Sequence, residues 1–218
     1  MKSFLIIGMG RFGRHLCENL AALGNEVMVI DQEEENVEPV LAFATDSRIG
    51  DCTKLQVLES LGVGNFDKCF VCIGSNFQSS LEITALLKDL GAQYVISKAG
   101  RDLHARLLMR VGADEIIYPE RDMAEKAAAM YSSDNVFDYF ELDEDFSMYE
   151  LEPWPEWIGK TLTETDLRRK HQINVTAVHQ QNGTITMPTA DYRFRKGEHI
   201  MVMGRNEDIR KIINHYKN

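Results

Sequence analysis

The strongest constraint on the fold lies near the start of the chain, where Gly8-Met9-Gly10-Arg11-Phe12-Gly13 forms the pattern G-x-G-x-x-G. A short apolar run, residues 4–7, precedes this pattern, and a stretch with helical periodicity follows it. Gly8 permits a tight turn, Gly10 lets the backbone approach a pyrophosphate, and Gly13 lets the helix pack closely on the strand. The helix N-terminus offers free N–H groups and partial positive charge to an anion. The sequence therefore predicts a strand–turn–helix unit that binds the phosphates of a nucleotide.

An acidic residue stands where this kind of site needs one. The apolar run 27–30 predicts a second strand, and Asp31 follows it, about 20 residues after the glycines. A carboxylate at this position accepts hydrogen bonds from the ribose hydroxyls. It would also repel a 2′-phosphate, which disfavours NADP.

Short apolar runs alternate with helical stretches through the first part of the chain, which is the βαβ pattern of a parallel sheet. Glycines just past the helical stretches agree with left-handed helix caps. Pro39 lies inside the weakest helical stretch, residues 33–42, and is expected to kink or shorten it. The predicted strands are Phe4–Ile7, Val27–Ile30, Ala44–Ile49, Cys69–Ile73, Tyr94–Ser97 and Glu115–Tyr118.

A different pattern begins after the loop residues 132–135. Strand-like runs without the glycine-punctuated rhythm follow, with a hairpin turn at Asn182-Gly183 and helical segments at 163–170 and 207–216. The fold class is therefore α/β: a Rossmann-like, doubly wound parallel sheet in residues 1–134, then a small α+β domain in residues 135–218. Its predicted strands are Ser147–Leu151, Val175–His179, Thr184–Met187 and Ile200–Met203.

Composition narrows the classes of function. The 218 residues include 24 Lys+Arg and 34 Asp+Glu, a net charge of −10, which disfavours binding to nucleic acid or to an anionic membrane. No apolar run is long enough to span a membrane and no export signal is present, so we expect a cytoplasmic protein. Cys69 and Cys72 form C-x-x-C within one apolar run, where residues three apart point to opposite faces of a strand. They are therefore expected to be core cysteines.

Further candidate ligand contacts follow the third and fourth strands, in Gly50-Asp51 and Gly74-Ser75-Asn76. Open α/β sheets hold their ligands at the carboxyl ends of strands. Asp51 could reach the adenine edge, and Asn76 a phosphate or the ribose. Ordinary turn chemistry explains each of these residues about equally well.

Basic residues bear on the identity of the ligand. Arg11 stands inside the phosphate loop, where a cation favours a ligand with more phosphate charge, such as ATP, over one that ends in a neutral nicotinamide. The alternative is that Arg11 points to solvent. Lys98 and Arg101 follow the fifth strand and add positive charge near the same edge, unless they belong to a solvated face.

Several motifs together resemble the RCK (KTN) domains, the TrkA-like regulatory subunits of potassium channels and transporters of the Ktr and Trk type, and above all the peripheral subunits of Ktr systems. The resemblance covers nearly the whole chain. It rests on the glycine motif and on residues 50–53, 73–78, 112–114 and 118–123. It implies a domain that binds ATP, ADP or NAD(H), homodimers assembled into an octameric ring, and gating of a potassium-transporting membrane subunit by the bound nucleotide.

The resemblance also implies roles for particular residues. Arg11 would contact the terminal phosphate of ATP across the dimer interface, and Glu120 would help to hold Mg²⁺ or Ca²⁺ there. Some members bind cyclic di-AMP in the C-terminal lobe. The alternative for Glu120 is an acid at a helix N-terminus, favoured by the helix dipole. The candidate nucleotide-binding residues are Gly8, Gly10, Arg11, Phe12, Gly13, Asp31, Asp51, Cys52, Gly74, Asn76, Lys98 and Arg101, with Glu120 as the candidate metal ligand.

Two enzymatic alternatives compete with regulation. An NAD-dependent oxidoreductase, or a related NADH redox sensor, would need a proton donor beside the nicotinamide and a substrate pocket. The histidines of the second domain, including His179 and His199, show no recurring partner spacing. ATP hydrolysis of the Walker type would need a G-x-x-x-x-G-K-[S/T] loop, which the sequence lacks. We therefore expect a non-enzymatic protein without catalytic residues.

Overall fold

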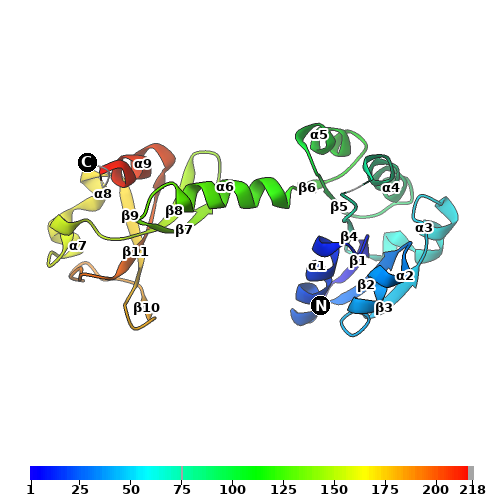
Figure 1. Cartoon of the computed structure of the whole chain (residues 1–218), viewed down its shortest axis with the longest axis horizontal. Coiled ribbons are helices and arrows are strands. Elements are labelled where there is room, and N and C mark those ends of the chain that lie inside the picture. Colours follow the sequence, from blue (N-terminus) through cyan, green and yellow to red (C-terminus); the bar gives the residue numbers. More distant parts are fainter. Residues whose placement is uncertain (75, 216–218) are drawn as a thin grey trace. The chain divides into compact units, whose positions relative to one another are not determined.

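The structure is a computed structural model that describes residues 1–74 and 76–215. The chain forms two compact units, Met1–Glu120 and Arg121–Asn218 (Figure 1). Ser75, part of one predicted ligand-binding turn, and residue 216, the predicted end of the last helix, lie outside the described residues. None of the described helices is both long and apolar enough to cross a membrane.

A six-stranded sheet forms the centre of the first unit, with strand order β3-β2-β1-β4-β5-β6 and parallel pairing between neighbours. Strand order reverses between β1 and β4, as in a doubly wound sheet. The strands are β1 (Ser3–Ile7), β2 (Glu26–Asp31), β3 (Asp46–Ile49), β4 (Lys68–Val71), β5 (Val95–Lys98) and β6 (Glu115–Ile117). The helices between them are α1 (Arg11–Ala22), α2 (Glu34–Val37), α3 (Leu55–Leu61), α4 (Phe77–Asp89) and α5 (Asp102–Arg110).

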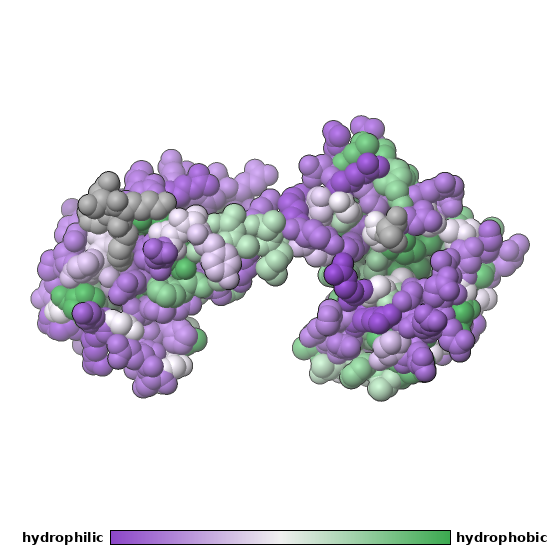
Figure 2. Space-filling view, viewed as in Figure 1, coloured by the Kyte–Doolittle hydropathy of each residue, from purple (hydrophilic) through white to green (hydrophobic). Residues whose placement is uncertain are grey.

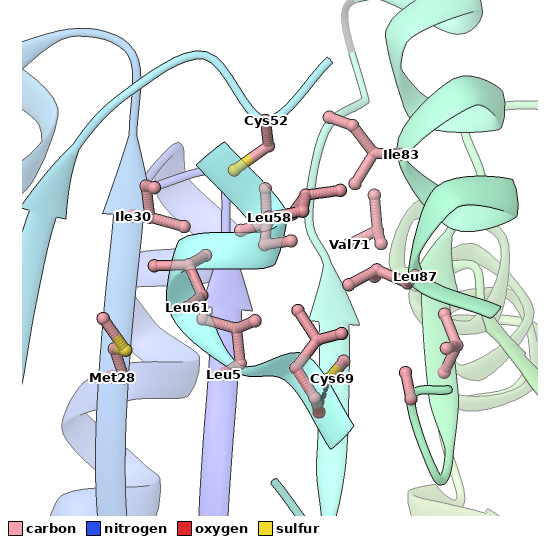
Figure 3. Close-up of a cluster of buried hydrophobic side chains, with 14 residues drawn as sticks. Leu5, Met28, Ile30, Cys52, Leu58, Leu61, Cys69, Val71, Ile83 and Leu87 are labelled. Carbon is pink, nitrogen blue, oxygen red and sulfur yellow. Dashed lines mark hydrogen bonds between the residues drawn. The ribbon is translucent and has the colours of Figure 1, made fainter. Parts of the chain in front are cut away.

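Both faces of the sheet are buried at its central strands β1, β2, β4 and β5, because these strands are apolar at successive positions. Leu5 of β1 packs in one cluster with Leu58 of α3 and Leu87 of α4 (Figure 3). Phe4, its neighbour in β1, packs on the other face in a cluster that includes Cys17 of α1. Burying a side chain of this size contributes about 1.5–3 kcal/mol. The predicted Rossmann-like fold of this unit is therefore confirmed.

Pro39 shortens its helix as expected. Helix α2 ends at Val37, and Pro39 lies in the 3₁₀ turn η1 (Glu38–Val40) that follows it. Proline fits the first turn of a helix, where its missing N–H would have no partner within the helix.

The two cysteines of the C-x-x-C motif lie on opposite faces of the sheet. Cys69 packs in the cluster that contains Leu5, and Cys72 packs in the cluster that contains Phe4. All four cysteines of the chain are free and buried. Burial raises the pKa of the thiols of Cys52, Cys69 and Cys72 to about 12. Cys69 and Cys72 are core residues, as predicted.

An antiparallel sheet with strand order β10-β9-β11-β8-β7 forms the second unit. Residues Ile200 and Val202 of β11 alternate with half-buried neighbours and face a core that includes Ile209 and Ile212 of the last helix. The strands are β7 (Val136–Glu141), β8 (Phe146–Leu151), β9 (Ile173–His179), β10 (Ile185–Thr186) and β11 (His199–Arg205). The helical elements are α6 (Pro119–Tyr131), η3 (Pro155–Trp157), α7 (Leu162–Thr165), α8 (Leu167–Lys170) and α9 (Asn206–His215).

This sheet confirms the predicted α+β domain but differs from the prediction in detail. Strand β7 was not expected, and β10 covers only two residues of the predicted run 184–187. The helix predicted over 163–170 is divided into α7 and α8 by Asp166, whose φ of 50° is left-handed.

Helix α6 belongs to the second unit over most of its length. Lys126 Nζ lies 2.8 Å from Asp138 Oδ1 of β7, and Ala129 packs against the second core. The two units divide at Glu120 and Arg121, near the start of α6, whereas the sequence placed the boundary at residues 134 and 135, after the helix. The sequence signal was the loop chemistry after α6, which marks the end of the helix and not its packing partner.

Candidate nucleotide-binding site

A cavity of about 940 Å³ opens at the carboxyl ends of the parallel strands. Its volume suits a ligand of nucleotide size. The loops after all six strands contribute to it, on both sides of the reversal between β1 and β4, where α/β sheets of this kind hold their ligands. The polar and glycine residues lining it include Gly8, Gly10, Arg11, His15, Asp31, Asn36, Gly50, Asp51, Gly74, Asn76, Lys98 and Glu120.

The glycine loop has the geometry that its sequence predicts. Gly8 has a φ of +96°, and its N–H donates to Ile30 O at 2.9 Å, which ties the loop to β2. A Cβ on Gly13 would lie 2.1 Å from the carbonyl oxygen of Gly8, so no side chain fits there. A Cβ on Gly10 would meet no atom within 4 Å, and Gly10 lines the cavity.

Helix α1 begins directly after Gly10, which caps it without a side-chain hydrogen bond. The first N–H groups of a helix have no partner within the helix. No acidic residue stands in the first turn of α1 to neutralise its partial positive charge. The loop and the helix therefore present an open cradle for an anion at the cavity.

Asp31 lies at the end of β2 in the cavity wall, where the ribose-binding acid was predicted. Its Oδ2 accepts the N–H of Met9 at 2.7 Å, and its Oδ1 accepts the N–H of Glu33 at 3.0 Å and Asn36 Nδ2 at 3.2 Å. The sequence did not predict the bond to Met9. Through it, Asp31 also fixes the position of the glycine loop.

We expect Asp31→Asn to weaken every ribose-bearing ligand by about tenfold, since a hydrogen bond to a charged group contributes about 1.5–3 kcal/mol. The measurement is calorimetric titration of ATP and of 2′-deoxy- and 3′-deoxy-ATP into both proteins. At least one deoxy analogue should bind the wild type more weakly than ATP, and this difference should shrink in the variant. Equal ATP affinity in the two proteins would show that Asp31 does not contact the ligand.

Asp51 and Asn76 both line the cavity, and both also accept hydrogen bonds from residues of their own turns. Asp51 Oδ1 accepts the Thr53 hydroxyl at 2.6 Å and its N–H at 3.0 Å, and these bonds lower the pKa of Asp51. Asn76 Oδ1 accepts the N–H of Ser79 at 3.1 Å and caps α4. Their contact with a ligand stays a prediction, while the turn chemistry that competed with it is observed.

Lys98 occupies the part of the cavity between the β4 and β5 loops. Its Nζ lies 2.8 Å from Glu120 Oε1, 6.0 Å from the centre of the Phe12 ring, and 3.3 Å from the point where a Cβ on Gly74 would stand. The Lys98 side chain is only 14% exposed. The hydrogen bond from Lys98, with a smaller contribution from the charge of Arg11, lowers the pKa of Glu120. A largely buried cation therefore lies next to an exposed carboxylate at the cavity.

The remaining predicted residues divide into two groups. Arg11, Phe12 and Cys52 line the cavity, and Cys52 is buried in its wall. Arg101 is absent from the lining, and its guanidinium lies over the Phe77 ring, 4.8 Å from the ring centre. Sequence reasoning missed several lining residues, among them His15, Asn36, Ile73 and Ile83. Helix periodicity could have indicated His15, which lies one turn after Arg11 on α1.

Fold and cavity together define a nucleotide-binding domain of the Rossmann type that is followed by a small α+β domain. The profile of the TrkA-N domain matches residues 4–119, and that of the TrkA-C domain matches residues 147–216. The chain belongs to this family of TrkA-like, KtrA-like potassium uptake proteins, which confirms the predicted resemblance.

Individual relatives agree with this assignment. The Ktr system potassium uptake protein C of Bacillus subtilis (strain 168) is 39% identical over 208 residues, 95% of this chain and 94% of that protein. The Ktr system potassium uptake protein A of the same strain is 34% identical over 213 residues, 98% of this chain and 96% of that protein. Both are named for potassium uptake and not for a catalysed reaction, in agreement with the expectation of a non-enzymatic protein.

Among solved structures, the chain is similar to the GsuK channel bound to NAD, with a TM-score of 0.65 and 16% identity over 95% of this chain and 38% of that chain. A structure of GsuK bound to ADP is similar with a TM-score of 0.51 and 16% identity over 62% of this chain and 36% of that chain. At this identity the likeness supports the fold, and this chain spans less than half of the channel's length.

Proposed function

We propose that the protein is a cytoplasmic regulatory subunit that reads adenine nucleotides, chiefly ATP and ADP, and controls a membrane subunit of a Ktr or Trk potassium transport system. One observation carries the proposal: the anion cradle of α1 shares its cavity with two cations, Arg11 and Lys98. Positive charge beyond the glycine loop suits a chain of phosphates better than a neutral nicotinamide. NAD(H) is the runner-up ligand, because the related GsuK channel has been solved with NAD.

Bound phosphates would change the pairing inside the cavity. Lys98 now neutralises Glu120, at 2.8 Å. A triphosphate that draws Lys98 toward it would leave the Glu120 carboxylate facing further negative charge, which is stable only with a bridging cation. Mg²⁺ and Ca²⁺ take carboxylate and phosphate oxygens as ligands. Glu120 alone is one ligand, so the phosphates, water and a second copy of the chain must supply the others.

From this we predict that Glu120→Gln abolishes the enhancement of ATP binding by Mg²⁺ or Ca²⁺. The amide keeps the size of the side chain and loses the charge that holds the cation. The measurement is ATP affinity with and without each cation. Glu125→Gln, which removes an exposed carboxylate five residues further along α6, should keep the enhancement. If the enhancement persists in Glu120→Gln, the cation binds at another position.

Assembly into homodimers and then an octameric ring is part of the proposal. No residue of α6 is buried within the described chain, although the helix carries Met123, Ala124 and Ala128 on its surface. Figure 2 shows pale green, mildly hydrophobic atoms along this helix. More apolar surface is exposed than a solvated helix needs, which supports a contact with a second copy. The family resemblance adds cyclic di-AMP as a candidate ligand of the C-terminal unit.

Regulation of this kind requires no chemical step. A ligand shifts a two-state assembly only as far as its affinities for the two states differ. If ATP favoured the open ring tenfold more than ADP does, the bias would be about 1.4 kcal/mol per site. Summed over the sites of a ring, such a bias is enough to gate a pore.

The proposal is tested by thermal unfolding of the purified protein with ATP, ADP, AMP, NAD, NADH and NADPH, each with and without Mg²⁺ or Ca²⁺. A ligand that binds the native state raises the midpoint according to its affinity. We expect the largest shifts from ATP and ADP, with a further gain for ATP when the cation is present. Dominance of NADH with no effect of ATP would overturn the proposal and favour a redox sensor or a small dehydrogenase.

A further inference from the structure

The antiparallel sheet of the second unit carries a cluster of metal-ligating side chains that the nucleotide site does not use. Glu150 comes from β8, His179 from the end of β9 and His199 from the start of β11. Strand β11 lies between the other two, and His199 is directly opposite His179. Glu150 is paired with Met201, two residues further along β11, so it lies on the same face of the sheet as His199.

Both imidazoles turn the same nitrogen toward one carboxylate oxygen. Glu150 Oε1 lies 3.1 Å from His179 Nδ1 and 2.9 Å from His199 Nδ1, and the three ligand atoms lie within 4.8 Å of one another. Among the residues that the structure describes, this is the one group of three or more His, Cys, Asp or Glu side chains so placed. We propose that Glu150, His179 and His199 form a binding site for a divalent transition-metal ion, with Zn²⁺ as the best fit.

The ligand set and its spacing suit zinc. Two imidazoles, one carboxylate and a water molecule complete a four-coordinate zinc site. Bonds of about 2.0–2.2 Å in a tetrahedron place neighbouring ligand atoms about 3.3 Å apart. The two observed N···O separations, 2.9 and 3.1 Å, need to grow by only a few tenths of an ångström. All three ligand atoms lie within 4.8 Å of one another, so adjustments of the side chains can bring them around an ion.

The surroundings hold the ligands in place and leave the ion a way in. The Phe137 ring stacks on the His199 ring, with centroids 3.6 Å apart and an interplanar angle of 18°, and so limits its rotation. The side chain of Glu150 is 15% exposed, while those of His179 and His199 are 39% and 30% exposed. The Glu150 carboxylate is thus mostly covered by protein, whereas the more exposed imidazoles are in contact with water, which can supply the fourth ligand.

The same chemistry separates this site from the cation proposed beside Glu120. Ca²⁺ and Mg²⁺ prefer shells made of oxygen atoms, whereas this cluster supplies two nitrogens and one oxygen. Zinc would link β9, β11 and β8, three neighbouring strands of one sheet. Because the unfolded chain has no such site, zinc binding adds to the stability of the second unit.

The test uses the full-length protein with any affinity tag removed and with metals stripped by a chelator. Zinc sulfate is titrated in by calorimetry against a competing chelator. We expect one zinc ion per chain, a rise in the thermal midpoint, and, with Co²⁺ in place of zinc, the intense visible absorption of a four-coordinate ion. His179→Gln should lower zinc affinity at least about 100-fold, since loss of outer-shell partners alone costs 10–100-fold.

Glu150→Gln keeps the shape of the carboxylate and removes its charge, and it should also weaken zinc binding. Glu141→Gln, which changes an exposed carboxylate on neighbouring β7, should leave zinc affinity unchanged. Thermal unfolding of each variant without metal checks that it folds, and ATP affinity should not change. The proposal would be overturned if zinc did not bind stoichiometrically, or if the folded variants His179→Gln and Glu150→Gln bound zinc as tightly as the wild type. Either result would mean that the three side chains only form hydrogen bonds with one another.

Discussion

Gly13→Ala is expected to lose both stability and nucleotide binding. The added Cβ would stand 2.1 Å from the carbonyl oxygen of Gly8, a backbone atom that cannot move without displacing the loop. Overpacking of this kind costs about 3 kcal/mol. The shift also separates the N-terminus of α1 from the turn, so ATP affinity should fall by at least an order of magnitude. Chemical denaturation and calorimetric titration measure the two effects.

Gly10→Ala is the matched control, because the same methyl group meets no atom within 4 Å. Its cost in stability should not exceed about 1 kcal/mol, which is the preference for glycine over alanine at a helix N-cap. Its methyl group nevertheless points into space that the phosphates would occupy, so ATP affinity should still fall. Full ATP affinity in Gly10→Ala would mean that the phosphates do not approach the backbone there.

Arg11→Ala is expected to weaken ATP binding by about 30-fold and ADP or NADH binding by less than about threefold. The first figure corresponds to about 2 kcal/mol, the typical contribution of a charge-assisted hydrogen bond to a phosphate. The Arg11 side chain is exposed at the cavity and lies close enough to Glu120 to affect its pKa. Titrations with the three ligands at one ionic strength give the ratio.

Arg106→Ala provides the comparison for a general loss of positive charge, since Arg106 is exposed on α5 and is absent from the cavity lining. It should leave all three affinities unchanged. Equal losses for ATP, ADP and NADH in Arg11→Ala would remove the role in sensing that we give to Arg11, while the nucleotide site itself would stand.

Much of the first unit could be predicted from the sequence because its signals are local. Buried parallel strands read as continuous apolar runs, and four of the helices, α1, α3, α4 and α5, end near a glycine. The second unit was harder. Strand β7 mixes aromatic and acidic residues at an edge of the sheet, with Phe137 and Phe140 exposed, so no continuous apolar run indicated it. Asp166 adopts a left-handed conformation although it is not a glycine, and it divides a helix that the periodicity predicts to be continuous.

The candidate sites show the same contrast between local and distant signals. The glycine loop and Asp31 follow from a motif whose parts lie close together in sequence. The pairing of Lys98 with Glu120 joins residues 22 positions apart and depends on β5 and β6 being neighbours. The cluster of Glu150, His179 and His199 depends on the pairing of three strands, and the spacing of its histidines gives no hint of it.

The four buried cysteines have a practical consequence for testing the proposed regulation by nucleotides. Desolvation raises the pKa of every one of these thiols, so few are thiolates at neutral pH, and only thiolates react with maleimides or similar reagents. A cysteine introduced on an exposed position of each unit would therefore be labelled selectively without removing the native ones. Spin labels or fluorophores attached in this way can report the distance between the two units with ATP, with ADP and with neither.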